Sequence, residues 1–191
     1  NTGAMLTSFI SYLRSNQNQI GSDRTIIVLP YANPDGRAAG NRFNTNNVDL
    51  NRNFDLPDWQ AQSYWQNRAY SNGGGSAPFS EPESRALRDL ILSENLVLSI
   101  SYHSNANLVI GDGIAQSFGD WYSNQTGYNR SQSNGEESDV SALGYVITGT
   151  YEEWATKKKG TPTLVIEFIS QTANEYTRNL PALKGLLTYP I

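Results

Sequence analysis

The sequence predicts an α/β fold in which helices flank a mixed, largely parallel central sheet. Short apolar runs with the composition of buried strands occur at residues 25–30, 96–104, 108–110 and 163–168. Segments with apolar residues at helical spacing lie between these runs. Strands that alternate with helices are typical of a sheet covered by helices. The chain has 191 residues, the size of one domain, and we see no internal repeat, so we expect a single domain over residues 1–191.

The first part of the chain alternates helix, strand and loop. Residues 4–13 carry apolar side chains at helical spacing, and residues 25–30 form a β-branched run bounded by turn residues, which predicts a buried strand. Residues 33–54 follow as a loop with three arginines and seven asparagines. Residues 55–78 are aromatic, rich in glycine and aperiodic, so we expect a long surface excursion there.

The later elements have clearer boundaries. A helix is predicted to begin at Ser80 as its N-cap, with Pro82 in the first turn and Glu83 at the capping-box position. The strand at 96–104 is apolar at first and ends in polar residues. The remaining expected elements are a second short strand at 108–110, a helix at 114–126, a flexible loop at 127–139, a loop that becomes a helix over 145–158, a strand at 163–168 and a helix at 180–187.

Composition excludes several classes of function. The net charge is −4, so the chain has no basic surplus with which to bind nucleic acid. It contains no cysteine, which excludes thiol catalysis, disulfides and cysteine-ligated zinc. No apolar run approaches the length of a membrane span.

Two titratable residues stand at the polar ends of predicted strands. His103 is the single histidine, and Glu167 lies inside an apolar strand. A lone histidine is commonly an ordinary core or surface residue, and Glu167 has the alternative of an ion pair with a nearby arginine. Ligands, however, usually bind at the carboxyl ends of strands in open α/β sheets, and a buried carboxylate must be paired, ligated or shifted in pKa. The residues therefore leave both the structural and the catalytic interpretation open.

The loop at 33–54 is open to the same two interpretations. Its guanidinium and amide groups are planar donors that match carboxylates and peptide carbonyls. Asparagine and glycine are also ordinary turn residues, so a solvated loop is the alternative.

Six short motifs together resemble the zinc carboxypeptidases of the carboxypeptidase A type, the M14 metallopeptidases. They occur in the order that this family shows, and the resemblance covers essentially the whole chain. The motifs are Asn33-Pro34-Asp35-Gly36, Arg42, Asp49-Leu50-Asn51-Arg52-Asn53-Phe54, Ser80-Glu81-Pro82-Glu83, Tyr102-His103-Ser104 and Ile166-Glu167.

The resemblance implies a role for individual residues. His103 is similar to the family's last zinc ligand, and Glu167 to the glutamate that takes a proton from the zinc-bound water and gives it to the leaving amine. Arg42 stands where the family has the arginine that stabilises the oxyanion. Asn51 and Arg52 resemble the clamp on the terminal carboxylate of the substrate.

The resemblance also implies how the substrate side chain is selected. Tyr145 has a spacing to Glu167 similar to that of the family's mobile tyrosine, which closes over the substrate. Glu152 falls close to the position that lines the specificity pocket, and an acid there would favour Lys, Arg or diaminopimelate. The alternative for Glu152 is a solvated helix residue beside Glu153. The segment 144–167 also looks like that of bacterial members that trim cell-wall peptides.

One part of the family pattern is missing from the sequence. The resemblance implies one Zn²⁺ ion with two further ligands, a His and a Glu in an H-x-x-E motif, which we expect upstream of Asn1. The central strand that leads into this motif is also missing, so the catalytic domain is expected to be incomplete at its N-terminus. We expect the missing segment to have been cleaved off, to be left out of the given sequence or to be supplied by another polypeptide; the alternative is a truncated and inactive product.

The resemblance thus implies a zinc metallocarboxypeptidase, a hydrolase that cleaves a peptide bond next to a free carboxylate. Its expected partners are a peptide with a free C-terminal carboxylate and the missing N-terminal segment. The alternative is a non-catalytic module that binds peptide carboxylates, or an inactive fragment of such an enzyme. We expect a secreted or periplasmic protein, although no pattern in the chain encodes that location.

Overall fold

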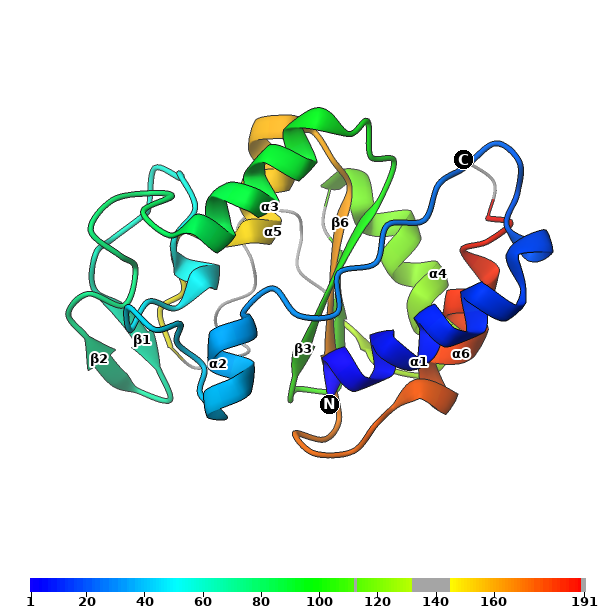
Figure 1. Ribbon diagram of the computed structural model, residues 1–191, viewed down its shortest axis with the longest axis horizontal. Coiled ribbons are helices and arrows are strands. Elements are labelled where there is room, and N and C mark those ends of the chain that lie inside the picture. Colours follow the sequence, from blue (N-terminus) through cyan, green and yellow to red (C-terminus); the bar gives the residue numbers. More distant parts are fainter. Residues whose placement is uncertain (112, 132–144, 190–191) are drawn as a thin grey trace. The chain divides into compact units, whose positions relative to one another are not determined.

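The chain folds into two compact units, which a computed structural model describes for residues 1–111, 113–131 and 145–189 (Figure 1). Unit 1 comprises Asn1–Pro30, Ile100–Gln132 and Leu164–Ile191. Unit 2 comprises Tyr31–Ser99 and Ser133–Thr163. No helix in the described part of the chain is long and apolar enough to cross a membrane. Whether residues 1–191 behave as one domain stays a prediction.

The sheet belongs mainly to unit 1 and is mixed, as the sequence predicts. Its strand order is β3-β6-β4-β5. The bounds are Ser99–Ser104 for β3, Leu108–Ile110 for β4, Asn129–Arg130 for β5 and Thr163–Phe168 for β6. The pair β6 and β4 is antiparallel, with Leu108 opposite Glu167, and the pair β4 and β5 is parallel.

Strands β3 and β6 run in the same direction. Near their starts Ser99 N–H donates to the Pro162 carbonyl at 2.8 Å, and beyond their ends Ala106 N–H donates to the Phe168 carbonyl at 3.1 Å. Because both chains advance together between these two bonds, the pair is parallel. The polar ends of the two strands therefore lie at the same edge of the sheet (Figure 1).

Three helices accompany this sheet in unit 1. They are α1 at Thr2–Ser15, α4 at Gln116–Thr126 and α6 at Tyr176–Gly185. Helix α4 contacts β4, β5 and α6, and α1 contacts α6. The Asn1 side chain caps α1, and Gly127, with φ of 70°, ends α4 in the left-handed conformation that glycine adopts without strain.

A buried hydrogen-bond chain joins β3 to these helices. The Tyr102 and Tyr122 hydroxyls lie 3.0 Å apart, Tyr122 donates to Asn179 Oδ1 at 2.6 Å, and Asn179 Nδ2 donates to the Tyr128 hydroxyl at 2.9 Å. Tyr128 donates in turn to Glu175 Oε2 at 2.6 Å. Burial raises the pKa of Tyr102 and of Tyr122, so both phenols stay neutral. The chain therefore fixes Tyr102 on the face of β3 that α4 and α6 cover.

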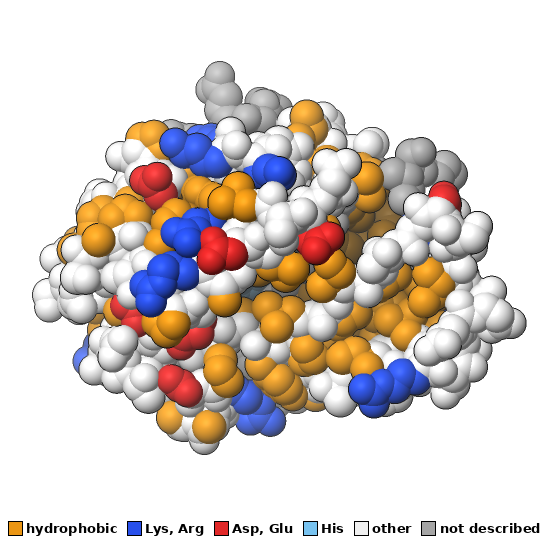
Figure 2. All heavy atoms as spheres, turned by 45° about the horizontal axis from the view of Figure 1, so that its top comes forward, with side chains coloured by type: hydrophobic (Ala, Val, Ile, Leu, Met, Phe, Trp, Pro, Cys, Tyr) orange, Lys and Arg blue, Asp and Glu red, His pale blue; other side chains and the backbone are white. Residues whose placement is uncertain are grey.

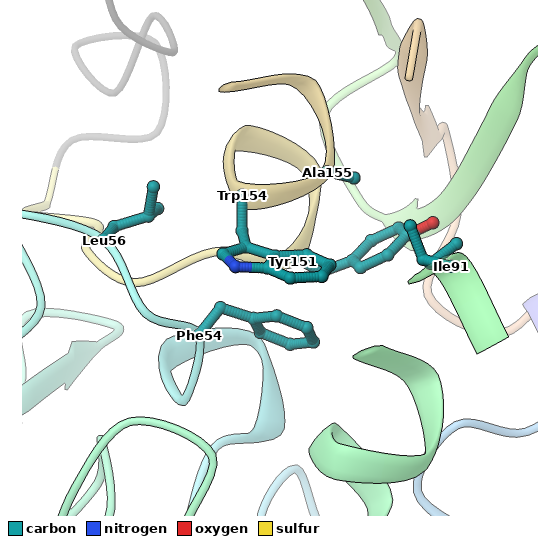
Figure 3. Packing of buried hydrophobic residues seen from close by; sticks show 6 residues of the cluster. All are labelled: Phe54, Leu56, Ile91, Tyr151, Trp154 and Ala155. Carbon is teal, nitrogen blue, oxygen red and sulfur yellow. The ribbon is translucent and has the colours of Figure 1, made fainter. Parts of the chain in front are cut away.

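Unit 2 is built from short elements around an aromatic cluster. Its elements are α2 at Pro34–Ala39, a 3₁₀ turn at Leu50–Arg52, the hairpin of β1 at Ser63–Trp65 and β2 at Arg68–Tyr70, α3 at Pro82–Ser93, and α5 at Tyr151–Trp154, which continues as a π-helix over Ala155–Lys159. Figure 3 shows the cluster: Phe54, Leu56, Ile91, Tyr151, Trp154 and Ala155. The Phe54 ring centroid lies 5.6 Å from that of Tyr151 and 5.7 Å from that of Trp154. These aromatic contacts join the loop after Asn53 to α5.

The prediction of a buried strand at residues 25–30 is wrong. In the described part of the chain this run forms no strand, and its residues alternate between half-buried and exposed. Ile27 is 46% and Leu29 is 48% exposed. A β-branched run becomes a strand only where another strand pairs with it, so the local pattern was insufficient. Figure 2 shows further hydrophobic side chains that lie open on one face.

Other boundaries also differ from the prediction. The excursion at 55–78 contains the β1–β2 hairpin, and the last helix is Tyr176–Gly185 in place of residues 180–187. The predicted loop at 127–139 begins with β5, and its residues from 132 onward lie outside the described residues. Helix α3 begins at Pro82 with Glu81 as N-cap and has no side-chain cap bond. The capping box at Ser80 and Glu83 is therefore wrong, because Ser80 Oγ donates to Glu81 Oε1 at 2.7 Å.

Glu81 instead ties the asparagine loop to α3. Its carboxylate accepts Asn44 Nδ2 at 2.8 Å and Asn46 Nδ2 at 2.7 Å, besides Ser80 Oγ, and only 4% of the residue is exposed. Burial works to raise the pKa of Glu81, but these hydrogen bonds and the charge of Arg85 outweigh it and hold the pKa below its usual value.

Replacing Glu81 by Gln is expected to lower the free energy of unfolding at neutral pH by about 1–3 kcal/mol, since the neutral amide loses the negative charge that strengthens the hydrogen bonds from Asn44, Asn46 and Ser80. A folded-state pKa below the unfolded value means that the stabilisation by Glu81 is present above the unfolded pKa and is lost as the pH falls through the folded pKa. Urea unfolding of both proteins from pH 7 downward measures this difference. Glu94→Gln, at the exposed end of α3, is the control. A gap between variant and wild type that stays constant to pH 3 would contradict the explanation.

Candidate functional site

His103 and Glu167 lie on the same face of the sheet in unit 1. His103 is on β3 and Glu167 is on the neighbouring strand β6. The Tyr102 ring packs edge-on against the Phe168 ring, with centroids 6.0 Å apart, so these two residues share a face. Side chains alternate along a strand. The residues next to each of them, His103 and Glu167, therefore share the opposite face.

The two residues differ in their surroundings. The half-buried His103 has Nε2 at 2.8 Å from Ser101 Oγ, and Ser101 occupies the same face two residues earlier. Glu167 is 7% exposed and lies opposite Leu108 of β4, with Val165 two residues before it on its own strand. A carboxylate buried beside aliphatic side chains is costly unless it is compensated, which makes Glu167 a candidate for proton transfer.

Arg42, in unit 2, is held by an ion pair and an aromatic ring. Its Nε lies 2.6 Å from Asp49 Oδ2, and the guanidinium carbon lies 5.9 Å from the Trp65 ring centroid. Asp49 is buried, and its Oδ1 accepts the Asn51 N–H at 3.2 Å. Trp65 belongs to the β1–β2 hairpin, which sequence analysis treated as a surface excursion. No local pattern in the sequence indicates that Arg42 lies over the ring of this tryptophan.

The segment before α5 packs against the loop that carries Asn51. Phe54 N–H donates to the Gly149 carbonyl at 3.0 Å, and a Cβ on Gly149, whose φ is +59°, would lie 2.8 Å from the Arg52 carbonyl oxygen. Glycine therefore permits this close approach. As a result the first residues of α5, Tyr151 and Glu152, lie beside Asn51.

The oxygen and the nitrogen of the Asn51 side-chain amide are both hydrogen-bonded to the first residues of α5. Asn51 Oδ1 accepts the Tyr151 N–H at 2.8 Å, and Asn51 Nδ2 donates to Glu152 Oε2 at 3.0 Å. The carboxylate clamp and the specificity residue expected from the sequence are thus in direct contact, although 101 positions separate them.

Arg52 is a buried cation next to this pair. The residue is 2% exposed and donates from one terminal nitrogen to the Asn51 carbonyl. Its Nε has no hydrogen-bond partner among the described residues. Burial lowers the pKa of Arg52, the charge of Arg42 lowers it further, and the nearby Asp49, Tyr145 and Glu152 work in the opposite direction. A desolvated guanidinium with a donor to offer is suited to binding a carboxylate.

The structure brings the predicted residues together as two groups. In unit 1 they are His103 and Glu167; in unit 2 they are Arg42, Asn51, Arg52, Tyr145 and Glu152, of which Tyr145 is half-buried and lies near Arg52. Within each unit, the residues of the group lie near one another. The assigned roles stay predictions.

The described residues do not fit a zinc ion by themselves. A catalytic zinc takes about three protein ligands, and histidine, cysteine and carboxylates are the usual ones. Among the described residues no group of three such side chains could hold a metal ion, and His103 is the chain's single histidine.

Sequence reasoning missed the part that Asn53 plays. Its side chain is fully buried, and Nδ2 donates to the Gly74 carbonyl at 2.8 Å, the Ala77 carbonyl at 3.0 Å and Ser80 Oγ at 3.0 Å. Its Oδ1 accepts the Glu81 N–H and the Ser84 hydroxyl. Asn53 therefore fixes the loop that carries Asn51 and Arg52 to α3. Its place at the end of the Asp49–Phe54 motif was the available signal.

Comparisons with known proteins agree with this arrangement. A family model described as zinc carboxypeptidase matches residues 2–184. The chain is 31% identical over 141 residues to murein peptide amidase A of Escherichia coli (strain K12), a match that covers 66% of this chain and 51% of that protein. It is 36% identical over 124 residues to the carboxypeptidase N catalytic chain of Rattus norvegicus, covering 53% of this chain and 26% of that one. The chain therefore spans about half or less of these relatives.

Solved structures show the same fold. The crystal structure of murein-tripeptide amidase MpaA from Escherichia coli O157 aligns with a TM-score of 0.68 at 23% identity, over 86% of this chain and 68% of that one. Carboxypeptidase A from Helicoverpa armigera aligns with a TM-score of 0.68 at 19% identity, over 95% and 56%. Bovine thrombin-activatable fibrinolysis inhibitor aligns with a TM-score of 0.70 at 16% identity, over 97% and 75%. These likenesses confirm the predicted α/β fold with its mixed sheet.

Proposed function

The chain belongs to the zinc carboxypeptidase family, and on that premise we propose that it hydrolyses the peptide bond next to a free terminal carboxylate. The observation that carries the proposal is the cluster in unit 2, where the buried Arg52 lies beside the Asn51 amide. A guanidinium and an amide together supply several donors to an anion, and a carboxylate accepts in the same planar geometry. Tyr145, next to Arg52, would cover the bound end of the peptide.

The reacting groups in this proposal are Glu167 and Arg42. Glu167 takes a proton from the attacking water and returns it to the amine that leaves. Arg42, oriented by Asp49, stabilises the negative charge that develops on the carbonyl oxygen.

Zinc is the family's metal, and a bound zinc ion would supply the activation of the attacking water. Within this chain the proposal gives it His103 as one ligand. The remaining ligands would have to come from outside the described residues.

The proposed substrate class is a peptide whose terminal residue carries a cationic side chain or a free amine. Glu152 supports this choice because it lies 3.0 Å from the clamp residue Asn51, within reach of a side chain on the residue that the clamp binds. Lys, Arg and diaminopimelate have this chemistry, and the similarity to a murein peptide amidase supports the last of them. The proposal includes a secreted or periplasmic location.

Hydrolysis of a matched set of acylated peptides tests the function. The set ends in Lys, diaminopimelate or Ala with a free carboxylate, and in Lys amide. We expect the terminal residue to be released from the first three, faster for Lys and diaminopimelate than for Ala, and no release from the amide. Equal cleavage of Lys and Lys amide would contradict the proposal. Binding that needs the free carboxylate but leads to no cleavage would instead support a non-catalytic peptide-binding module.

A further inference from the structure

The Asn51 side chain is oriented by its two contacts. The Tyr151 N–H donates to Asn51 Oδ1, which fixes the oxygen toward the start of α5, and Nδ2 then donates to Glu152 Oε2. The Thr150 hydroxyl, which accepts the Glu153 N–H at 3.3 Å, holds this end of α5 in place. Asn51 can therefore offer an anion only its Nδ2 group.

Without a ligand, the Asn51 Nδ2 group already donates to the Glu152 carboxylate. A ligand carboxylate must either replace the Glu152 oxygen or share Nδ2 with it, and sharing would place two carboxylates on one nitrogen. Like charges so close together disfavour each other strongly. Glu152 also lies near enough to Arg52 to offset part of the positive charge of that guanidinium.

We infer that the Glu152 carboxylate competes with the ligand carboxylate for the Asn51 side-chain amide. The amide then binds a ligand carboxylate readily only when the ligand also brings a cation to Glu152. A cationic side chain would draw the Glu152 carboxylate toward itself and free Nδ2 for the terminal carboxylate. A neutral side chain offers no such exchange. Glu152 thus selects against neutral terminal residues as well as for cationic ones. This inference rests on the proposed function, because it takes Asn51 as part of the clamp.

The experiment measures affinities of acylated dipeptides ending in Lys or Ala, with free carboxylate or amide, by calorimetry. In Glu152→Met, which removes the acceptor and the charge at similar length, we expect the Lys peptide to bind about tenfold more weakly and the Ala peptide about tenfold more tightly. The short Ala side chain avoids a direct gain from contact with Met. Glu152→Gln, which keeps an acceptor without the charge, should lie between. An Ala peptide that binds Glu152→Met no better than wild type would overturn the inference.

A double-mutant cycle separates competition from a general loss of repulsion. In an Asn51→Ala background, Glu152→Met should no longer tighten the Ala peptide, since the contested amide is gone. Tightening that persists there would also overturn the inference. Glu153→Gln, which loses the Lys157 ion pair on the same turn, is the matched control and should leave the ratio of Lys to Ala affinity unchanged. If wild type binds carboxylate and amide peptides equally, the proposed function itself fails, which is a distinct outcome.

Discussion

Replacing Glu167 by Gln is expected to lower the turnover of a peptide with a free terminal carboxylate by about 10²–10⁴-fold. Glutamine keeps the shape and hydrogen-bonding size of the side chain but cannot take up and return a proton. Because Glu167 is not one of the clamp residues, binding of the same peptide should change little. The measurement is kcat for a Lys-terminated peptide together with its dissociation constant in both proteins.

The buried position of Glu167 requires a stability control for this experiment. Both proteins should be compared by thermal unfolding, since a 7% exposed side chain also packs against its neighbours. Asp120→Asn changes an acid of the same unit that is exposed and paired with Arg130, and it should leave turnover unchanged. If Glu167→Gln kept full turnover, Glu167 would not be the proton carrier.

Local sequence patterns predicted three strands and one helix close to their observed positions. The strands β3, β4 and β6 and helix α3 lie within a few residues of their expected bounds, because each combines propensity with a clear apolar pattern. The run at 25–30 has the same local pattern and yet has no ladder in the described structure. The difference is a partner strand, which is a property of the whole fold.

The asparagine loop shows how composition can mislead. Its seven asparagines left a ligand-binding loop and a solvated loop open, and several of them bond to the protein itself. Asn33 caps α2, Asn44 donates to Glu81, and Asn53 holds the loop to α3. A buried amide has to satisfy its own donors and acceptors first, so only the three-dimensional contacts show which ones remain for a ligand.

The candidate site was predictable as a set of residues and not as a set of contacts. The order of the motifs indicated Asn51 and Glu152 separately, but their hydrogen bond joins positions 101 residues apart. Likewise, the sequence placed Arg42 without the ring of Trp65 that lies beneath it. The shared face of His103 and Glu167 follows from two facts. The Tyr102 and Phe168 rings are in contact, and neighbouring side chains along a strand point to opposite faces of the sheet.

Replacing Arg52 by Met is expected to weaken binding of a peptide with a free carboxylate by about 30-fold or more, the usual effect of losing one partner of a desolvated charge pair. The peptide amide should lose much less, so discrimination between carboxylate and amide should nearly vanish. Arg52→Lys should restore only part of it, because an ammonium lacks the planar fork. Calorimetric titration of both peptides against each variant measures the discrimination.

The fold should tolerate this change, which makes the result interpretable. Asp49, the nearest buried acid, keeps its ion pair with Arg42 when Arg52 is replaced, so no buried carboxylate loses all its compensation. Arg37→Met, an exposed arginine on α2 beside Tyr31, is the control and should bind both peptides as wild type does. If Arg52→Met still preferred the carboxylate, the clamp would lie elsewhere. Because Asn51 can donate only through Nδ2, the guanidinium must supply most of the carboxylate affinity, and this variant measures that share directly.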